Sequence, residues 1–215
     1  MPATPFFSLK ISALFTLLFI VLLWLLKSTE LLTGLSLLEF GIYPGKFSGL
    51  IGIPLAPLIH GSFAHLVANT LPLFILGTTI LHIYPRSAIH AIPIIYLLSG
   101  IGVWIFARPS YHIGASGLTY GMMFFIFFVG VLRQDRLPIA LSMLVFFLYG
   151  GMIWGLLPHD PKISFEYHFF GAMTGIVLAF IMKNRDPKIP EKKYDWEDEP
   201  EDEEDPVIGD EWRQP

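Results

Sequence analysis

The sequence predicts an all-α membrane protein in which six transmembrane helices form a bundle and both termini lie in the cytoplasm. Apolar residues make up 53% of the chain, a share typical of polytopic membrane proteins. Six apolar runs, each near the roughly 20 residues that cross a bilayer core, alternate with short polar or Gly- and Pro-rich segments. Charge is uneven, because residues 1–190 carry 11 Lys and Arg against 6 Asp and Glu, whereas residues 191–211 hold 12 of the 18 acids.

The first apolar run, residues 6–26, is interpreted as a retained span rather than a signal peptide. Its apolar part is longer than that of a signal peptide, and no small-x-small cleavage site follows. Segment 27–59 is broken by Gly and Pro but keeps many apolar side chains, which favours a loop lying against the membrane surface. The other five predicted spans are residues 60–83, 87–106, 116–132, 138–157 and 166–182.

Loop charges orient these spans. With the N-terminus inside, inner segments hold nine Lys and Arg and outer loops hold four, so the positive-inside rule favours cytoplasmic termini. We expect a six-span domain over residues 1–183 and an acidic, disordered cytoplasmic tail over 184–215. A compact chain without a presequence indicates a multi-pass protein of a bacterial plasma membrane. The absence of cysteine excludes disulfides, thiol nucleophiles and thiolate metal sites.

Polar residues gather at one depth of the predicted bundle. Spans two, four and six all run from outside to inside, so their first residues lie near the outer face. Ser116 opens span four, His65 and Asn69 lie in the first turns of span two, and His168 lies in the first turn of span six. A polar side chain within a span is costly unless it faces a partner or a water-filled cavity. The Ser116 hydroxyl therefore has two candidate partners, the two histidines.

Glycine spacing favours His168 as that partner. Gly117 and Gly121 form a small-xxx-small pair on span four, and Gly171 and Gly175 form another on span six. Such pairs let two helix backbones approach closely. If these spans pack through their glycines, His168 comes against Ser116 and can take its proton, as a serine nucleophile requires.

Other polar groups fit the same chemistry. Tyr120 lies one turn below Ser116 and could hold the imidazole ring in place. His65 and Asn69 share a helix face, and with the Ser116 backbone N–H they could donate to an oxyanion. Each feature also has a plainer interpretation, because a Gly-x-Ser-Gly stretch is usually a turn and a Gly-xxx-Gly pair usually only packs helices. A metal site at the outer histidines is not favoured, since the H-E-x-x-H pattern is missing.

Together these motifs resemble the rhomboid family of intramembrane serine proteases over roughly residues 6–182. The resemblance is carried by three stretches: His60-Gly-Ser-Phe-Ala-His65-Leu-Val-Ala-Asn69, Gly114-Ala-Ser116-Gly117 with Tyr120, and His168-Phe-Phe-Gly171-Ala-Met-Thr-Gly175.

The resemblance implies a rhomboid-like helical bundle with particular residue roles. Ser116 would be the nucleophile and His168 the general base. His65, Asn69 and the Ser116 amide would be oxyanion donors, with Tyr120 stacked on His168. It further implies that segment 27–59 is the membrane-lying first loop and 158–165 a cap over the site. Glu166 and Tyr167, which precede His168, depart from the small residue that the family commonly has there.

We therefore expect a serine endopeptidase that cleaves membrane-anchored substrates through a Ser116–His168 dyad, without a cofactor. Its partners would be transmembrane protein substrates and membrane lipid, with no nucleic acid. The alternative is a non-catalytic rhomboid-like protein that binds transmembrane clients without cutting them. A third hypothesis, a small transporter or channel, would need ionisable groups spread through the membrane depth, whereas these cluster near one face.

Overall fold

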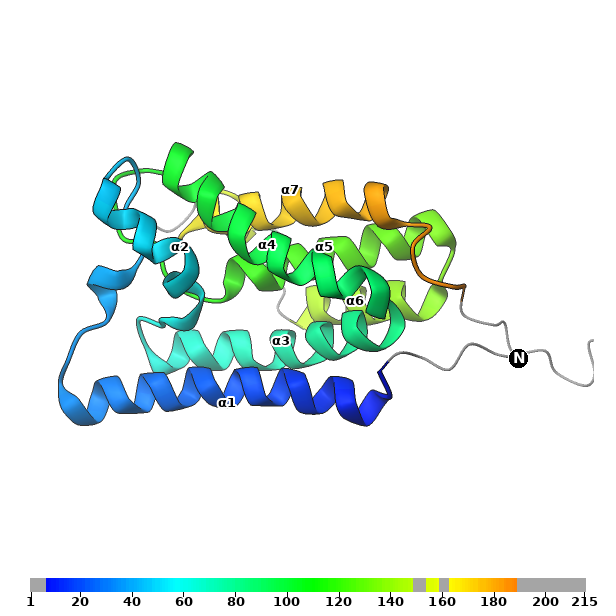
Figure 1. Ribbon diagram of the computed structural model, residues 1–215, viewed down its shortest axis with the longest axis horizontal. Coiled ribbons are helices and arrows are strands. Elements are labelled where there is room, and N and C mark those ends of the chain that lie inside the picture. The colour runs from blue at the N-terminus through cyan, green and yellow to red at the C-terminus, as the bar shows by residue number, and fades with distance from the viewer. Residues whose placement is uncertain (1–6, 149–153, 159–162, 189–215) are drawn as a thin grey trace, which may run out of the picture.

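The computed structural model describes residues 7–148, 154–158 and 163–188. All the secondary-structure elements named in these residues are α-helices or 3-10 helices. Figure 1 shows α1 running alongside α3, with α7 on the opposite side of the bundle. The α-helices are α1 (Leu9–Thr33), α2 (Gly52–Leu55), α3 (Phe63–Ile83), α4 (Pro85–Phe106), α5 (Ser116–Arg133), α6 (Arg136–Leu148) and α7 (Phe165–Met182). The 3-10 helices are η1 (Leu38–Phe40), η2 (Phe47–Ile51), η3 (Ala56–Leu58) and η4 (Trp154–Leu156).

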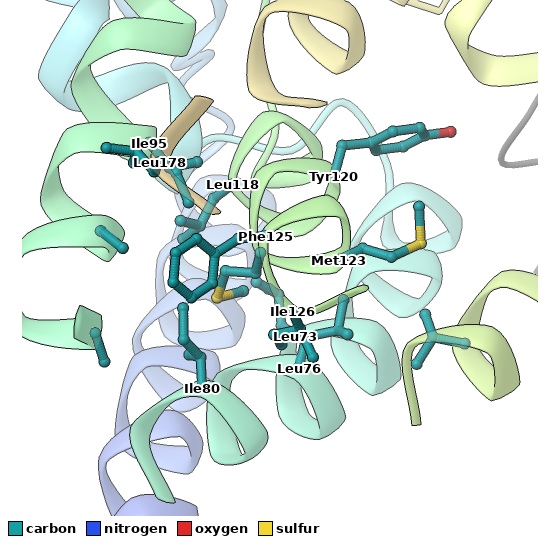
Figure 2. Packing of buried hydrophobic residues seen from close by; sticks show 14 of the residues in the cluster. Leu73, Leu76, Ile80, Ile95, Leu118, Tyr120, Met123, Phe125, Ile126 and Leu178 are labelled. Carbon is teal, nitrogen blue, oxygen red and sulfur yellow. The ribbon is translucent and has the colours of Figure 1, made fainter. Parts of the chain in front are cut away.

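Helix α5 is the centre of the bundle. It packs on α3, α4, α6 and α7, and most of its length is buried inside the protein. Its residues 118–132 include no charged side chain, so nothing ionic has to be accommodated there. Phe125 and Ile126 are fully buried, and Figure 2 shows them near Leu73 and Ile80 of α3. The residue that begins α5 is therefore mounted on the best-packed helix of the fold.

Five helices are long and apolar enough to cross a membrane: α1, α3, α4, α5 and α7. They account for five of the six predicted spans, and for all but α1 the boundaries are close to those expected from the apolar runs. The remaining prediction, residues 138–157, corresponds to α6 and η4, but residues 149–153 lie outside the described part of the chain. The 13 described residues of α6 are too few for a span by themselves.

Helix α1 extends seven residues beyond the predicted span and includes the start of the predicted first loop. It ends at Thr33, where Gly34 has a φ of 71° and its N–H bonds to the Glu30 carbonyl at 3.0 Å. Lys27 and Glu30 form an ion pair at 2.7 Å, one turn apart on the same face. The prediction that a loop begins at Lys27 was wrong, because the Glu30 carboxylate compensates the Lys27 charge within the last turns of the helix.

The first residues after α7 also pack on the bundle. Asp186 is buried, and its carboxylate accepts hydrogen bonds from the backbone N–H groups of Arg86 (2.8 Å) and Ser87 (3.1 Å) at the start of α4. Arg133 donates to the carbonyl oxygens of Lys183 (3.1 Å), Asp186 (2.7 Å) and Pro187 (2.7 Å). Asp186 and Pro187, which the sequence assigns to the tail, are thus bonded to α4 and α5. The rest of that predicted tail, 189–215, lies outside the described residues.

Candidate functional site

Ser116 is the first residue of α5 and is nearly buried, with 9% of its surface exposed. The turn before it requires glycine, because Gly114 has a φ of +110° and its N–H bonds to the Ala56 carbonyl at 2.8 Å. No side chain caps the N-terminus of α5. The first N–H groups of a helix lack partners within it and lie at its positive dipole end, so the start of α5 is suited to a negative charge.

Helices α5 and α7 approach at backbone distance. A Cβ at Gly171 or Gly175 would collide with the carbonyl oxygen of Gly117 or Gly121 respectively, and one at Gly121 would lie 3.0 Å from the Gly171 oxygen. The structure therefore brings together the two glycine pairs that the sequence singles out. Close packing of this kind depends on the missing side chains.

This packing continues to the ends of the helices that carry Ser116 and His168. A Cβ at Gly117, next to Ser116, would lie 2.5 Å from the ring of Tyr167, next to His168. Tyr167, the departure from the family pattern, thus fills the space that Gly117 leaves open. Glu166, the other departure, pairs with Arg108, with 3.4 Å between the guanidinium Nε and Oε1.

His168 is held on two sides. Its ring is stacked on that of Tyr120, with centroids 4.2 Å apart and planes 6° from parallel. Its Nδ1 lies 2.8 Å from the carbonyl oxygen of Gly155, which can only accept, so Nδ1 carries the proton in the neutral ring. The lone pair is then on Nε2, the nitrogen that a general base needs.

His65 and Asn69 lie on α3 and contact the residues on either side of Ser116 in the chain. A Cβ at Gly114 would lie 2.6 Å from Cε1 and 2.8 Å from Nε2 of His65, so this ring rests against the turn before Ser116. Asn69 is buried and donates from Nδ2 to the His65 carbonyl at 3.0 Å. Its Oδ1 accepts from the Thr119 hydroxyl of α5 at 3.5 Å, which joins the two helices. An amide nitrogen has two hydrogens, so Asn69 retains a second one to donate.

Two groups at the site were not singled out by the sequence, and a third, His60, was named in the matching stretch without a role at the site. The Gly155 carbonyl is a backbone group and has no signature in a sequence. Thr119 could have been found from its position one turn from Ser116. His60 has a buried ring that lies edge-on to His65, with centroids 5.0 Å apart, and its Nε2 accepts from the Ala115 N–H at 3.5 Å. Burial, and secondarily the neighbouring His65, lower the pKa of His60 to about 3, so it accepts as a neutral imidazole.

The described part of the chain contains no group of three or more His, Asp or Glu side chains arranged to hold a metal ion. The groups gathered here are a serine at the N-terminus of α5, a histidine whose Nδ1 faces a carbonyl on the adjoining α7, and the polar side chains of His65 and Asn69 on α3.

The model of the Rhomboid domain matches residues 47–185. "Uncharacterized protein Rv1337" of Mycobacterium tuberculosis is 34% identical over 184 residues, covering 81% of this chain and 75% of that protein. "Uncharacterized protein ML1171" of Mycobacterium leprae is 32% identical over 184 residues, with 81% and 71% covered. "Putative rhomboid protease YdcA" of Bacillus subtilis is 25% identical over 171 residues, with 75% and 76% covered. A match over more than half of the chain is decisive, and this protein belongs to the rhomboid family.

Proposed function

We propose that this rhomboid-family protein is an intramembrane serine endopeptidase that hydrolyses peptide bonds in or near transmembrane segments of membrane-anchored substrates. Ser116 is the nucleophile and His168 the general base. Ser116 through its backbone N–H, His65 and Asn69 are the oxyanion donors, and Tyr120 orients the base. Family membership supports the reaction class, and the residue roles are supported by the contacts of the site itself.

The observation that carries the proposal is the double restraint on His168. An imidazole that only filled space in a core would need neither a parallel aromatic partner nor a fixed proton. Here the Tyr120 ring supports one face, and the Gly155 carbonyl holds the proton on Nδ1. Nε2 is thereby kept as the basic nitrogen, and α7 carries the ring at its junction with α5.

The reaction follows from these groups in two stages. As the Ser116 oxygen bonds to the scissile carbonyl carbon, its proton passes to His168 Nε2 and the carbonyl electrons move onto oxygen. When the intermediate collapses, the C–N bond breaks, the leaving amine takes the proton from His168, and an acyl-enzyme remains. Water then attacks the ester with His168 again as base, which releases the carboxylic acid and restores Ser116.

The membrane arrangement of this enzyme is part of the proposal. We infer a multi-pass protein of a bacterial plasma membrane with six spans and both termini in the cytoplasm. The five long apolar helices support the membrane location, and the mycobacterial relatives are consistent with a bacterial origin. In this orientation the N-termini of α3, α5 and α7, and hence the site, lie toward the outer face.

A fluorophosphonate probe tests the proposal, since it reacts covalently with an activated serine. The purified protein in detergent should be labelled, Ser116→Ala should not be, and Ser48→Ala, an exposed serine of the first loop, should be labelled like the wild type. Equal labelling of Ser116→Ala would exclude Ser116 as the nucleophile. No labelling of a correctly folded wild type would favour the client-binding alternative over a protease.

A further inference from the structure

His112 is a buried histidine that has no part in the reaction above. Only 1% of its surface is exposed, although it lies in the loop between α4 and α5, four residues before Ser116. Its backbone N–H and carbonyl both bond to Ile42 of the first loop, at 2.9 and 3.0 Å. The ring is therefore fixed from the backbone side, and its two nitrogens are directed at other segments.

The hydrogen bonds of the His112 ring have a definite direction. Nε2 lies 3.0 Å from the Arg108 carbonyl, which can only accept, so this nitrogen carries the proton of the neutral ring. Nδ1 then has the lone pair and accepts from the Ser164 hydroxyl at 2.5 Å. Burial lowers the pKa of His112, against the opposing influence of the Arg108 carbonyl and the Glu166 carboxylate, which agrees with a neutral ring.

Ser164 connects the His112 ring to α7, the helix that carries the proposed base. It is the N-cap of α7, and its Oγ accepts from the Tyr167 N–H at 3.2 Å. Its carbonyl accepts from the His168 N–H at 3.4 Å. One side chain on the Ser116 loop thus reaches, through a single hydroxyl, the turn of α7 that carries His168.

We propose that His112 is a positioning residue that fixes the first turn of α7, and hence His168, relative to the loop that presents Ser116. The atom of His112 that acts is Nδ1, which accepts from the Ser164 hydroxyl, and Ser164 in turn caps α7. This inference rests on the proposed dyad. Position matters because a displacement of about 1 Å between reacting groups can cost roughly a hundredfold in rate.

Two substitutions separate the two nitrogens of His112. His112→Asn places an amide oxygen where Nδ1 was, so the bond from Ser164 is retained. His112→Gln places its amide nitrogen near the former Nε2, so only the contact with the Arg108 carbonyl is retained. If His112 positions α7, His112→Asn should keep kcat within about threefold of wild type, whereas His112→Gln should lower kcat about tenfold or more with KM little changed. The opposite order would overturn the proposal, because His112 would then only stabilise its own loop.

Ser164 provides a second test should either His112 variant fail to fold. Ser164→Ala should lower kcat as His112→Gln does, and Ser164→Thr, which keeps the hydroxyl, should restore it. The double variant His112→Gln, Ser164→Ala should be no slower than the worse single variant, since both break one connection. Ser110→Ala is the matched control, because that hydroxyl contacts Nε2 (3.2 Å) without touching α7, and it should keep wild-type kcat. Additive losses in the double variant would contradict the proposal.

Measurements of the wild type and Ser116→Ala in the same assay distinguish a failure of the proposed protease function from a failure of the proposed role of His112. Cleavage by wild type and none by Ser116→Ala, together with wild-type kcat for His112→Gln and Ser164→Ala, would leave the proposed function intact and remove the role of His112. An inactive wild type would overturn the protease assignment and this inference with it.

Discussion

The ring of Tyr120 lies parallel to the ring of His168, at 4.2 Å between centroids and 6° between planes. The two residues come from different helices, α5 and α7, so the stack fixes the ring of the proposed base relative to the helix that begins with Ser116. An aromatic contact of this kind is worth about 0.5–1.5 kcal/mol, enough to hold one ring orientation against its alternatives.

Replacing Tyr120 should therefore affect turnover more than substrate binding. Tyr120→Ala removes the stack, and we expect kcat to fall roughly tenfold, in line with the energy of an aromatic contact. Tyr120→Phe retains the ring and should keep most of the activity. Steady-state cleavage of a transmembrane substrate measures both variants. If Tyr120→Phe lost as much activity as Tyr120→Ala, the hydroxyl rather than the stack would be the functional part of Tyr120.

The glycine contact between α5 and α7 should not tolerate a side chain. Gly171→Leu should separate α5 from α7, and Gly121→Leu, where a Cβ would also collide with Ile95 of α4, should displace α5 from both neighbours. Both should lower the free energy of unfolding by about 1–3 kcal/mol or more and lower activity by moving His168 from Ser116. Melting temperature and cleavage rate are the measurements. Met173→Leu is the control, since Met173 lies on α7 between Gly171 and Gly175 and is 43% exposed. Wild-type behaviour of both glycine variants would mean that this contact does not set the geometry of the site.

Asp186 should stabilise the end of the bundle where α7 ends and α4 begins. Asp186→Ala would leave the Arg86 and Ser87 N–H groups of α4 without their acceptor, and we expect a loss of about 1–3 kcal/mol in unfolding free energy. Thermal unfolding in detergent measures the effect, with Glu39→Ala, an exposed acid of the first loop, as the control. An unchanged melting temperature for Asp186→Ala would show that the Asp186 carboxylate contributes nothing to the stability of the bundle.

His60 should make the fold less stable at acidic pH. Its pKa is about 3 in the folded protein, against an ordinary value of about 6.5 when unfolded, so the unfolded chain binds the proton first as the pH falls. Stability is thus fully present above about pH 6.5 and is lost as the pH drops below it, at up to about 1.4 kcal/mol per pH unit. His60→Gln removes this titration, so its unfolding free energy should vary less between pH 6.5 and 4. An identical pH dependence in the two proteins would contradict a neutral, buried His60.

Much of the fold could be predicted from the sequence because membrane spans have a plain signature in apolar length. The close approach of α5 and α7, the helices that begin near Ser116 and His168, followed from glycine spacing, which is a sequence property. The end of α1 was placed too early because Gly and Pro are frequent in residues 27–59, although the i,i+3 spacing of Lys27 and Glu30 was a sequence signal that the helix continues. The Gly155 carbonyl and the His112–Ser164 bond were inaccessible, since they depend on how distant loops fold together. Asp186 was hidden in a segment whose overall composition indicates disorder.

The most direct test of the central claim is cleavage of a model transmembrane substrate by wild type, Ser116→Ala, His168→Ala and the double variant. Nucleophile and base act as a unit, so each single variant should lose activity entirely and the double variant should be no worse than either. All four proteins should remain folded, as judged by melting temperature. Substantial cleavage by a folded Ser116→Ala or His168→Ala variant would contradict the Ser116–His168 dyad.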